Sequence, residues 1–160
     1  MATASRGARV LILLGSESDL AVVEKAPALL ERFGLSHRIE VASAHRQPDR
    51  LRALVAEAEA GGTQVFIAVA GMAAHLPGVV ASLTGLPVIG VPVASGPLGG
   101  VDALLSIVQM PPGVPVATVA IGSAGARNAA CLAARIIGLA DPGVAAAVEA
   151  YRRELAAGAR

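Results

Sequence analysis

The stretch Ile39-Glu40-Val41-Ala42-Ser43-Ala44-His45-Arg46-Gln47-Pro48 joins a predicted strand to a predicted helix. Residues 39–42 end the strand, and Pro48 suits the first turn of a helix that continues to about residue 60. In an α/β sheet, a loop from a strand to a helix lies at the carboxyl edge of the strands, where ligands bind. We therefore expect residues 43–46 to face a ligand.

Within four residues this loop offers a hydroxyl, an imidazole and a guanidinium, from Ser43, His45 and Arg46. An imidazole transfers protons near neutral pH, and a guanidinium binds a phosphate through two parallel hydrogen bonds. Taken alone, the loop is more simply interpreted as a surface histidine beside a solvated arginine. The rest of the chain favours the functional interpretation.

The same alternation of strand and helix continues along the whole chain. Apolar runs predict five strands, near residues 9–14, 37–42, 64–70, 87–91 and 114–121. Helical patterns lie between and after them, near residues 19–33, 48–60, 76–84, 101–109 and 124–139. Pro27 lies inside the first helical pattern, so we expect a kink or a break there. Residues 1–160 are predicted to form one three-layer α/β/α domain with a parallel sheet, its core spanning about residues 8–140.

Composition excludes several classes of function. The 160 residues carry a net charge of +1, 2% aromatic residues and no tryptophan, which argues against a nucleic-acid-binding surface. The single cysteine, Cys131, excludes an internal disulfide and a cysteine-based metal site. The apolar segment after residue 9 is too short for a signal peptide. We expect a cytoplasmic protein.

A long part of the chain is nearly free of charge. Residues 61–101 contain no Asp, Glu, Lys or Arg, and Asp102 is the only one up to residue 126. Frequent prolines and glycines divide this stretch into pieces too short to span a membrane, and such pieces are typical of a parallel sheet covered on both faces. A monomer of this size cannot bury so long an uncharged stretch, so we predict a homo-oligomer; sedimentation as a monomer would contradict this.

A last helix is predicted over about residues 142–157. Its apolar residues form a stripe at helical spacing, consisting of Val144, Val148, Tyr151 and Leu155. This stripe packs either on its own subunit or on a neighbouring one. We favour the neighbour because of the predicted oligomer.

Two further loops follow predicted strands and converge on the same sheet edge. Gly15-Ser16-Glu17-Ser18-Asp19 places two hydroxyls at a helix N-terminus, which favours an anion, and Asp19 suits the hydroxyls of a ribose. Ala70-Gly71-Met72-Ala73-Ala74-His75 offers backbone N–H groups and little bulk, which suits a small planar or anionic group. Simple helix capping and tight loop packing are the structural alternatives.

Five motifs, in order and in register, resemble one family. They are Gly15-Ser16-x-Ser18-Asp19, Ser43-Ala44-His45-Arg46-x-Pro48, Ala73-Ala74-His75-Leu76-Pro77-Gly78, Leu104-Leu105-Ser106-Ile107-Val108-Gln109-Met110-Pro111 and Gly125-Ala126-Arg127-Asn128-Ala129-Ala130. Over about residues 8–140 the chain resembles the catalytic-subunit family of phosphoribosylaminoimidazole carboxylase. The resemblance is to its class I form, the N5-carboxyaminoimidazole ribonucleotide mutases of purine biosynthesis.

The resemblance implies a flavodoxin-like fold, a homo-octamer and no metal or organic cofactor. It implies conversion of N5-carboxyaminoimidazole ribonucleotide to 4-carboxy-5-aminoimidazole ribonucleotide. His45 would be the general acid and base, and the backbone of residues 70–74 would line the carboxylate or CO2 pocket. The remaining implied substrate-binding residues are Ser16, Ser18, Ser43 and Arg46 at the phosphate, Asp19 at the ribose and His75 at the pocket edge, together with Ala44 and Leu76.

Three positions depart from the family pattern: Leu20 replaces Trp, Met72 replaces Gly, and Pro27 interrupts a helix. Met72 bears most on function because it lies in the loop that would hold CO2. Two alternatives therefore stay open, direct carboxylation of aminoimidazole ribonucleotide and a nucleotide-binding module without turnover. The partners expected are a small nucleotide and further copies of the chain, with neither nucleic acid nor membrane; a transient contact with the enzyme that makes the labile substrate is left open.

Overall fold

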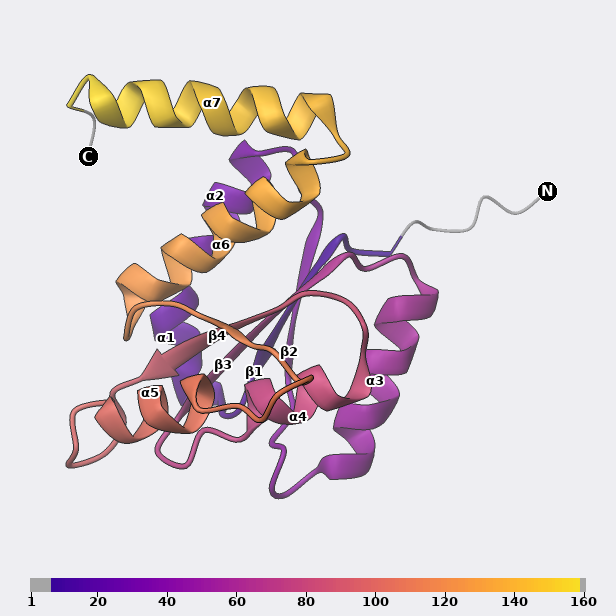
Figure 1. The fold of residues 1–160 in the computed structure, drawn as a ribbon, viewed down its shortest axis with the longest axis vertical. Coiled ribbons are helices and arrows are strands. Elements are labelled where there is room, and N and C mark those ends of the chain that lie inside the picture. The colour runs from indigo at the N-terminus through magenta and orange to yellow at the C-terminus, as the bar shows by residue number, and fades with distance from the viewer. Residues whose placement is uncertain (1–6, 159–160) are drawn as a thin grey trace.

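A parallel sheet of five strands forms the centre of the structure, a computed structural model that describes residues 7–158 (Figure 1). The strands are β1 (Val10–Leu14), β2 (His37–Val41), β3 (Val65–Gly71), β4 (Val88–Val93) and β5 (Ala117–Thr118). They lie in the order β2-β1-β3-β4-β5. The connections after β1 and β3 therefore leave the sheet in opposite directions, which creates a crevice at the carboxyl ends of these two strands.

Helices cover both faces of the sheet, as the three-layer prediction requires (Figure 1). On one face lie α1 (Leu20–Val23), α2 (Ala26–Arg32) and α6 (Ser123–Gly138), with α7 (Pro142–Ala156) stacked outside them. On the other face lie α3 (Pro48–Ala60), α4 (Leu76–Leu83) and α5 (Val101–Val108). Side chains of β1 alternate between the two cores, and all five are buried, because successive residues of a strand point to opposite faces. The three-layer α/β fold with a parallel sheet is confirmed.

The break predicted at Pro27 is also confirmed. A short 3-10 helix, η1 (Glu17–Asp19), leads into α1, which ends at Val23, and α2 begins at Ala26 with Pro27 in its first turn. Proline has no N–H to donate within a helix, so the chain starts a new helix where its ring is tolerated.

The last strand is much shorter than the sequence predicted. We expected a strand over residues 114–121, but β5 contains only Ala117 and Thr118. Strand β5 lies at the edge of the sheet and pairs with β4 alone. Pro115 has no N–H to give to a ladder, which removes support from the start of the predicted strand.

The C-terminal helix α7 packs on its own chain. Asp141 caps it by accepting hydrogen bonds from the amides of Gly143 and Val144, at 3.0 and 3.2 Å. Val144 is buried in the core, and the ring of Tyr151 meets that of Phe33 edge-on at 5.5 Å. Leu155, the last residue of the predicted stripe, is 47% exposed. Docking of this helix on a neighbouring subunit stays a prediction.

Within residues 7–158, no helix is long and apolar enough to cross a membrane. Residues 1–6, part of the N-terminal segment used for the cytoplasmic prediction, lie outside the described residues.

Candidate active site

One cleft of about 580 Å³ lies at the carboxyl edge of the sheet. Loops that follow β1, β2, β3 and β4 form its walls. It is lined by Gly15, Ser16, Ser18, Asp19, Ser43, Ala44, His45, Arg46, Ala70, Gly71, Met72, Ala73, His75, Leu76 and Ser95. The cleft thus brings together every predicted site residue except Ala74, and it adds Gly15 and Ser95.

The loop after β1 is held by its own side chains. The Ser16 hydroxyl accepts a hydrogen bond from the Ser18 amide at 3.4 Å, and Oδ2 of Asp19 accepts one from the Ser16 amide at 3.1 Å. The two contacts form a capping box. Asp19 is only 4% exposed, and burial raises the pKa of its carboxyl despite the opposing effect of the Ser16 amide. Capping and ligand binding are therefore compatible roles for this loop.

The loop after β2 places an arginine beside a serine hydroxyl. Oγ of Ser43 accepts hydrogen bonds from the backbone amide of Arg46 at 3.2 Å and from its Nε at 3.4 Å. The amide of Gln47 closes the turn onto the carbonyl of Ser43 at 2.8 Å. Among the described residues, Arg46 forms no salt bridge, so its terminal guanidinium nitrogens are available to an anion.

Two histidines meet in the cleft. Nε2 of His45 lies 2.5 Å from Nδ1 of His75, and the two rings meet at 70° with centroids 4.5 Å apart. His45 follows β2, whereas His75 precedes α4. In such a contact one nitrogen donates a proton and the other accepts it, so each ring sets the tautomer of the other. The sequence placed His75 only at the pocket edge; the structure brings it into direct contact with His45.

The loop after β3 is compact and strained. Met72 has φ +53° and is the only non-glycine residue with a positive φ within residues 7–158. The amides of Ala74 and His75 donate to the carbonyls of Met72 and Ala73, at 2.9 and 2.8 Å. Ala74 is 2% exposed and lies beneath the loop, which is why it does not line the cleft. In the described part of the chain, the amides of Met72 and Ala73 have no backbone acceptor.

Ser95 is the site residue that sequence reasoning missed. It belongs to the Gly/Pro-rich loop at residues 95–100, which contains none of the predicted site residues. The available signal is its position directly after β4, the fourth strand to end at the sheet edge.

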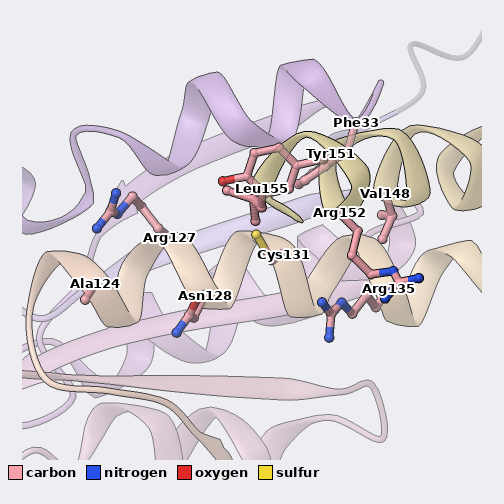
Figure 2. A pocket seen from close by; sticks show the side chains of 10 residues that line it. All are labelled: Phe33, Ala124, Arg127, Asn128, Cys131, Arg135, Val148, Tyr151, Arg152 and Leu155. Atoms are coloured by element: carbon pink, nitrogen blue, oxygen red, sulfur yellow. The ribbon is translucent and has the colours of Figure 1, made fainter. Parts of the chain in front are cut away.

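A second groove, of about 330 Å³, lies between α6 and α7 (Figure 2). Figure 2 shows Cys131 below Tyr151 and Leu155, with Arg127 and Arg135 on the same helix. Burial raises the pKa of the Cys131 thiol more than the two guanidinium groups lower it. The thiol therefore stays protonated at neutral pH, which fits a packed thiol and not a nucleophile.

Within residues 7–158, no three His, Cys, Asp or Glu side chains lie close enough together to hold a metal ion. The site chemistry rests on the two histidines, Asp19, Arg46 and the hydroxyl and amide groups of the cleft.

Fold and cleft together define a flavodoxin-like α/β protein whose site lies at the switch point of its sheet. The family model described as AIR carboxylase matches residues 9–157. The chain belongs to this family.

Relatives of the chain support the same assignment. The N5-carboxyaminoimidazole ribonucleotide mutase of Thermotoga maritima is 54% identical, with 92% of this chain and 85% of that protein covered. The mutase of Escherichia coli K12 is 53% identical, with 88% of this chain and 83% of that protein covered. A crystal structure of Treponema denticola PurE is 34% identical and superposes with a TM-score of 0.84, covering 92% of this chain and 90% of that one.

Proposed function

We propose that this protein is an N5-carboxyaminoimidazole ribonucleotide mutase, which forms 4-carboxy-5-aminoimidazole ribonucleotide in purine biosynthesis. The observation that carries the proposal is the contact between His45 and His75 inside a cleft that also holds an arginine free of ion pairs with the described residues. The histidines supply the proton transfer that this reaction needs, and the arginine supplies the phosphate binding. The identity of 53–54% to two mutases supports the same conclusion.

The substrate binds along the cleft in the order of the strands. Arg46 and the hydroxyls of Ser16, Ser18 and Ser43 hold the phosphate, next to the ends of β1 and β2. The buried carboxyl of Asp19 accepts from the ribose hydroxyls. The base then extends towards β3, so that its carboxyl group reaches the backbone of residues 70–73.

The reaction needs one proton to be delivered and one to be removed. Protonated His45 gives its proton to the exocyclic nitrogen as the bond between that nitrogen and the carboxyl carbon breaks, which releases CO2. The bond's electron pair stays on the nitrogen. Ring carbon 4 then attacks the trapped CO2, and neutral His45 removes the proton from that carbon, which restores its starting state. Positioned proton transfer of this kind contributes about a hundredfold to ten-thousandfold in rate.

His75 controls the tautomer of His45. Through its contact with Nε2 of His45 it fixes which nitrogen of His45 carries a proton. The closeness of the β3 loop keeps CO2 beside the ring, which replaces a bimolecular recombination by an intramolecular one.

Substitution of His45 by Asn tests this assignment. We expect turnover of the nucleotide to fall by about a hundredfold to ten-thousandfold, while affinity for the product changes little because Arg46 and Ser43 are intact. Steady-state rates and calorimetric titration with product measure the two quantities. His37→Asn is the matched control, because His37 lies at the start of β2, outside the cleft. Undiminished turnover in His45→Asn would contradict the mechanism.

We further propose a homo-octamer acting in the cytoplasm. Leu98, Val101, Leu105 and Val108 form an apolar stripe along and just before α5, each between 47% and 63% exposed. A stripe of this kind is typical of an interface with another copy. A lone free cysteine suits the reducing cytoplasm. The proposal also includes a transient contact with the enzyme that delivers the labile substrate.

A further inference from the structure

The hydroxyl of Ser95 lies directly against Gly71. A Cβ placed on Gly71 would come within 1.8 Å of Oγ of Ser95, so no other residue fits at position 71 without moving that hydroxyl. The φ of Gly71 is not positive, so its backbone conformation does not demand glycine. The Ser95 side chain and the carbonyl of Val93 therefore leave little room for a side chain at this position, and a Cβ there would displace the Ser95 hydroxyl.

The backbone fixes where this hydroxyl lies. Ser95 follows β4, and its amide donates to the carbonyl of Val93 at 3.1 Å, which ties the residue to the end of the strand. Strand β4 pairs with β3 up to Gly71, opposite Val93. The end of β4 thus carries the hydroxyl over the last residue of β3.

Within residues 7–158, the Ser95 hydroxyl has no hydrogen-bond partner, although it lines the cleft. It follows the same β3–β4 edge as the amides of Met72 and Ala73, which also lack a backbone acceptor. Three polar groups at one end of the cleft are thus without a partner from the fold itself. Each of these three groups can donate a hydrogen bond to an oxygen atom.

The position along the sheet shows which part of the substrate this end meets. In the order β2-β1-β3-β4, Ser95 follows β4 and Arg46 follows β2, so two strands separate them. The phosphate cannot be bound at both ends of the cleft. With the phosphate at Arg46 and the ribose at Asp19, the part of the substrate left to reach Ser95 is the base with the carboxyl group that the reaction moves.

We propose that the Ser95 hydroxyl donates a hydrogen bond to the transferring carboxyl group and keeps it in the cleft between bond cleavage and bond formation. This inference rests on the proposed mutase function. The hydroxyl exchanges no proton in the reaction, because His45 performs both transfers. Its contribution is to hold CO2 against Gly71 until ring carbon 4 attacks it.

Substitution of Ser95 by Ala removes the hydroxyl and adds no volume. The variant and the wild type are supplied with N5-carboxyaminoimidazole ribonucleotide in buffer containing ¹³C-bicarbonate, and both the rate and the label in the product are measured. We expect kcat to fall by about tenfold to a hundredfold, the effect of one hydrogen bond to a charged group, with a smaller change in KM because the phosphate contacts remain. We also expect more ¹³C in the product, because CO2 that escapes is replaced from solution.

Ser82→Ala is the matched control. Ser82 lies on α4, its hydroxyl donates to the carbonyl of Val79 at 2.7 Å, and it does not line the cleft. It should behave as the wild type. A Ser95→Ala variant with the rate and label of the wild type would overturn the proposal, as would a slower variant that incorporates no extra label, because the hydroxyl would then act only on structure. If the wild type itself forms no product, the mutase function fails as well, and the wild-type reaction in the same experiment shows this separately.

Discussion

At the scale of single residues, the chemistry of the cleft depends on pairs that are far apart in sequence. His45 and His75 are 30 positions apart, and each is brought to the cleft by a different strand. The sequence identified both residues and the loops that carry them. It did not show their contact, because the distance between two loops depends on the pairing and twist of the strands below them.

Asp19 gives a prediction about pH at this scale. Burial raises the pKa of its carboxyl above the ordinary value of 3.8, so ionisation costs more in the folded chain than in the unfolded one. The stabilising contribution of this group is therefore fully present below pH 3.8 and is lost as the pH rises through its folded pKa.

We expect Asp19→Asn to gain stability relative to the wild type as the pH rises through the interval from 3.8 to just above the folded pKa of Asp19. Asparagine keeps an oxygen that accepts from the Ser16 amide but cannot ionise. Urea denaturation of both proteins across the interval measures the difference in free energy of unfolding. The exposed Asp49→Asn serves as control. A difference between wild type and Asp19→Asn that does not change with pH would rule out this account of Asp19.

At the scale of elements, a prediction follows from the loop after β3. Met72 is 56% exposed and adopts φ +53°, a conformation that costs an L-residue roughly 1–2 kcal/mol. We expect Met72→Gly to raise stability by up to about 1 kcal/mol, because the relief of strain exceeds the greater freedom of glycine in the unfolded chain. Thermal denaturation measures the gain.

Met72→Ala is the control for this change. Alanine removes the same side chain but keeps the Cβ, so the strain remains and stability should not rise. Equal stability of the glycine and alanine variants would show that side-chain contacts, and not the backbone conformation, determine the energy of this loop.

The elements themselves were predicted best where the local sequence decides them. The helix over residues 48–60 begins at a proline and ends before two glycines, and the structure reproduces both ends. The strand predicted over residues 114–121 has only two residues in the structure, because an edge position and Pro115 limit its pairing. Pro115 is visible in the sequence, but the apolar pattern does not say which strand lies at the edge of the sheet.

At the scale of the whole molecule, the uncharged stretch of residues 61–101 forms the centre of the sheet and one end of the cleft. It contains β3 and β4, whose residues are buried with the exception of the half-buried Gly71. Its exposed large apolar side chains are Met72, in the loop after β3, and Leu98 and Val101, at the start of the α5 stripe where we propose contact with another copy. The topology then explains the cleft, because β1 and β3 lie side by side and their loops turn to opposite faces.

The lining of the candidate cleft was therefore predictable in its residues but not in its arrangement. Thirteen of the fourteen predicted site residues line the cleft, because each follows a strand that ends at one sheet edge. Ala74 is the exception, since a tight turn buries it. Ser95 was missed because its position depends on the close approach of β3 and β4, which only the structure shows.

The most direct test of the central claim is formation of 4-carboxy-5-aminoimidazole ribonucleotide by the purified protein from two substrates in parallel. One reaction receives fresh N5-carboxyaminoimidazole ribonucleotide, and the other receives aminoimidazole ribonucleotide with bicarbonate. The mutase function predicts fast product formation in the first reaction and little in the second. The reverse result would identify a direct carboxylase, and no product from either would contradict catalysis and leave a nucleotide-binding module.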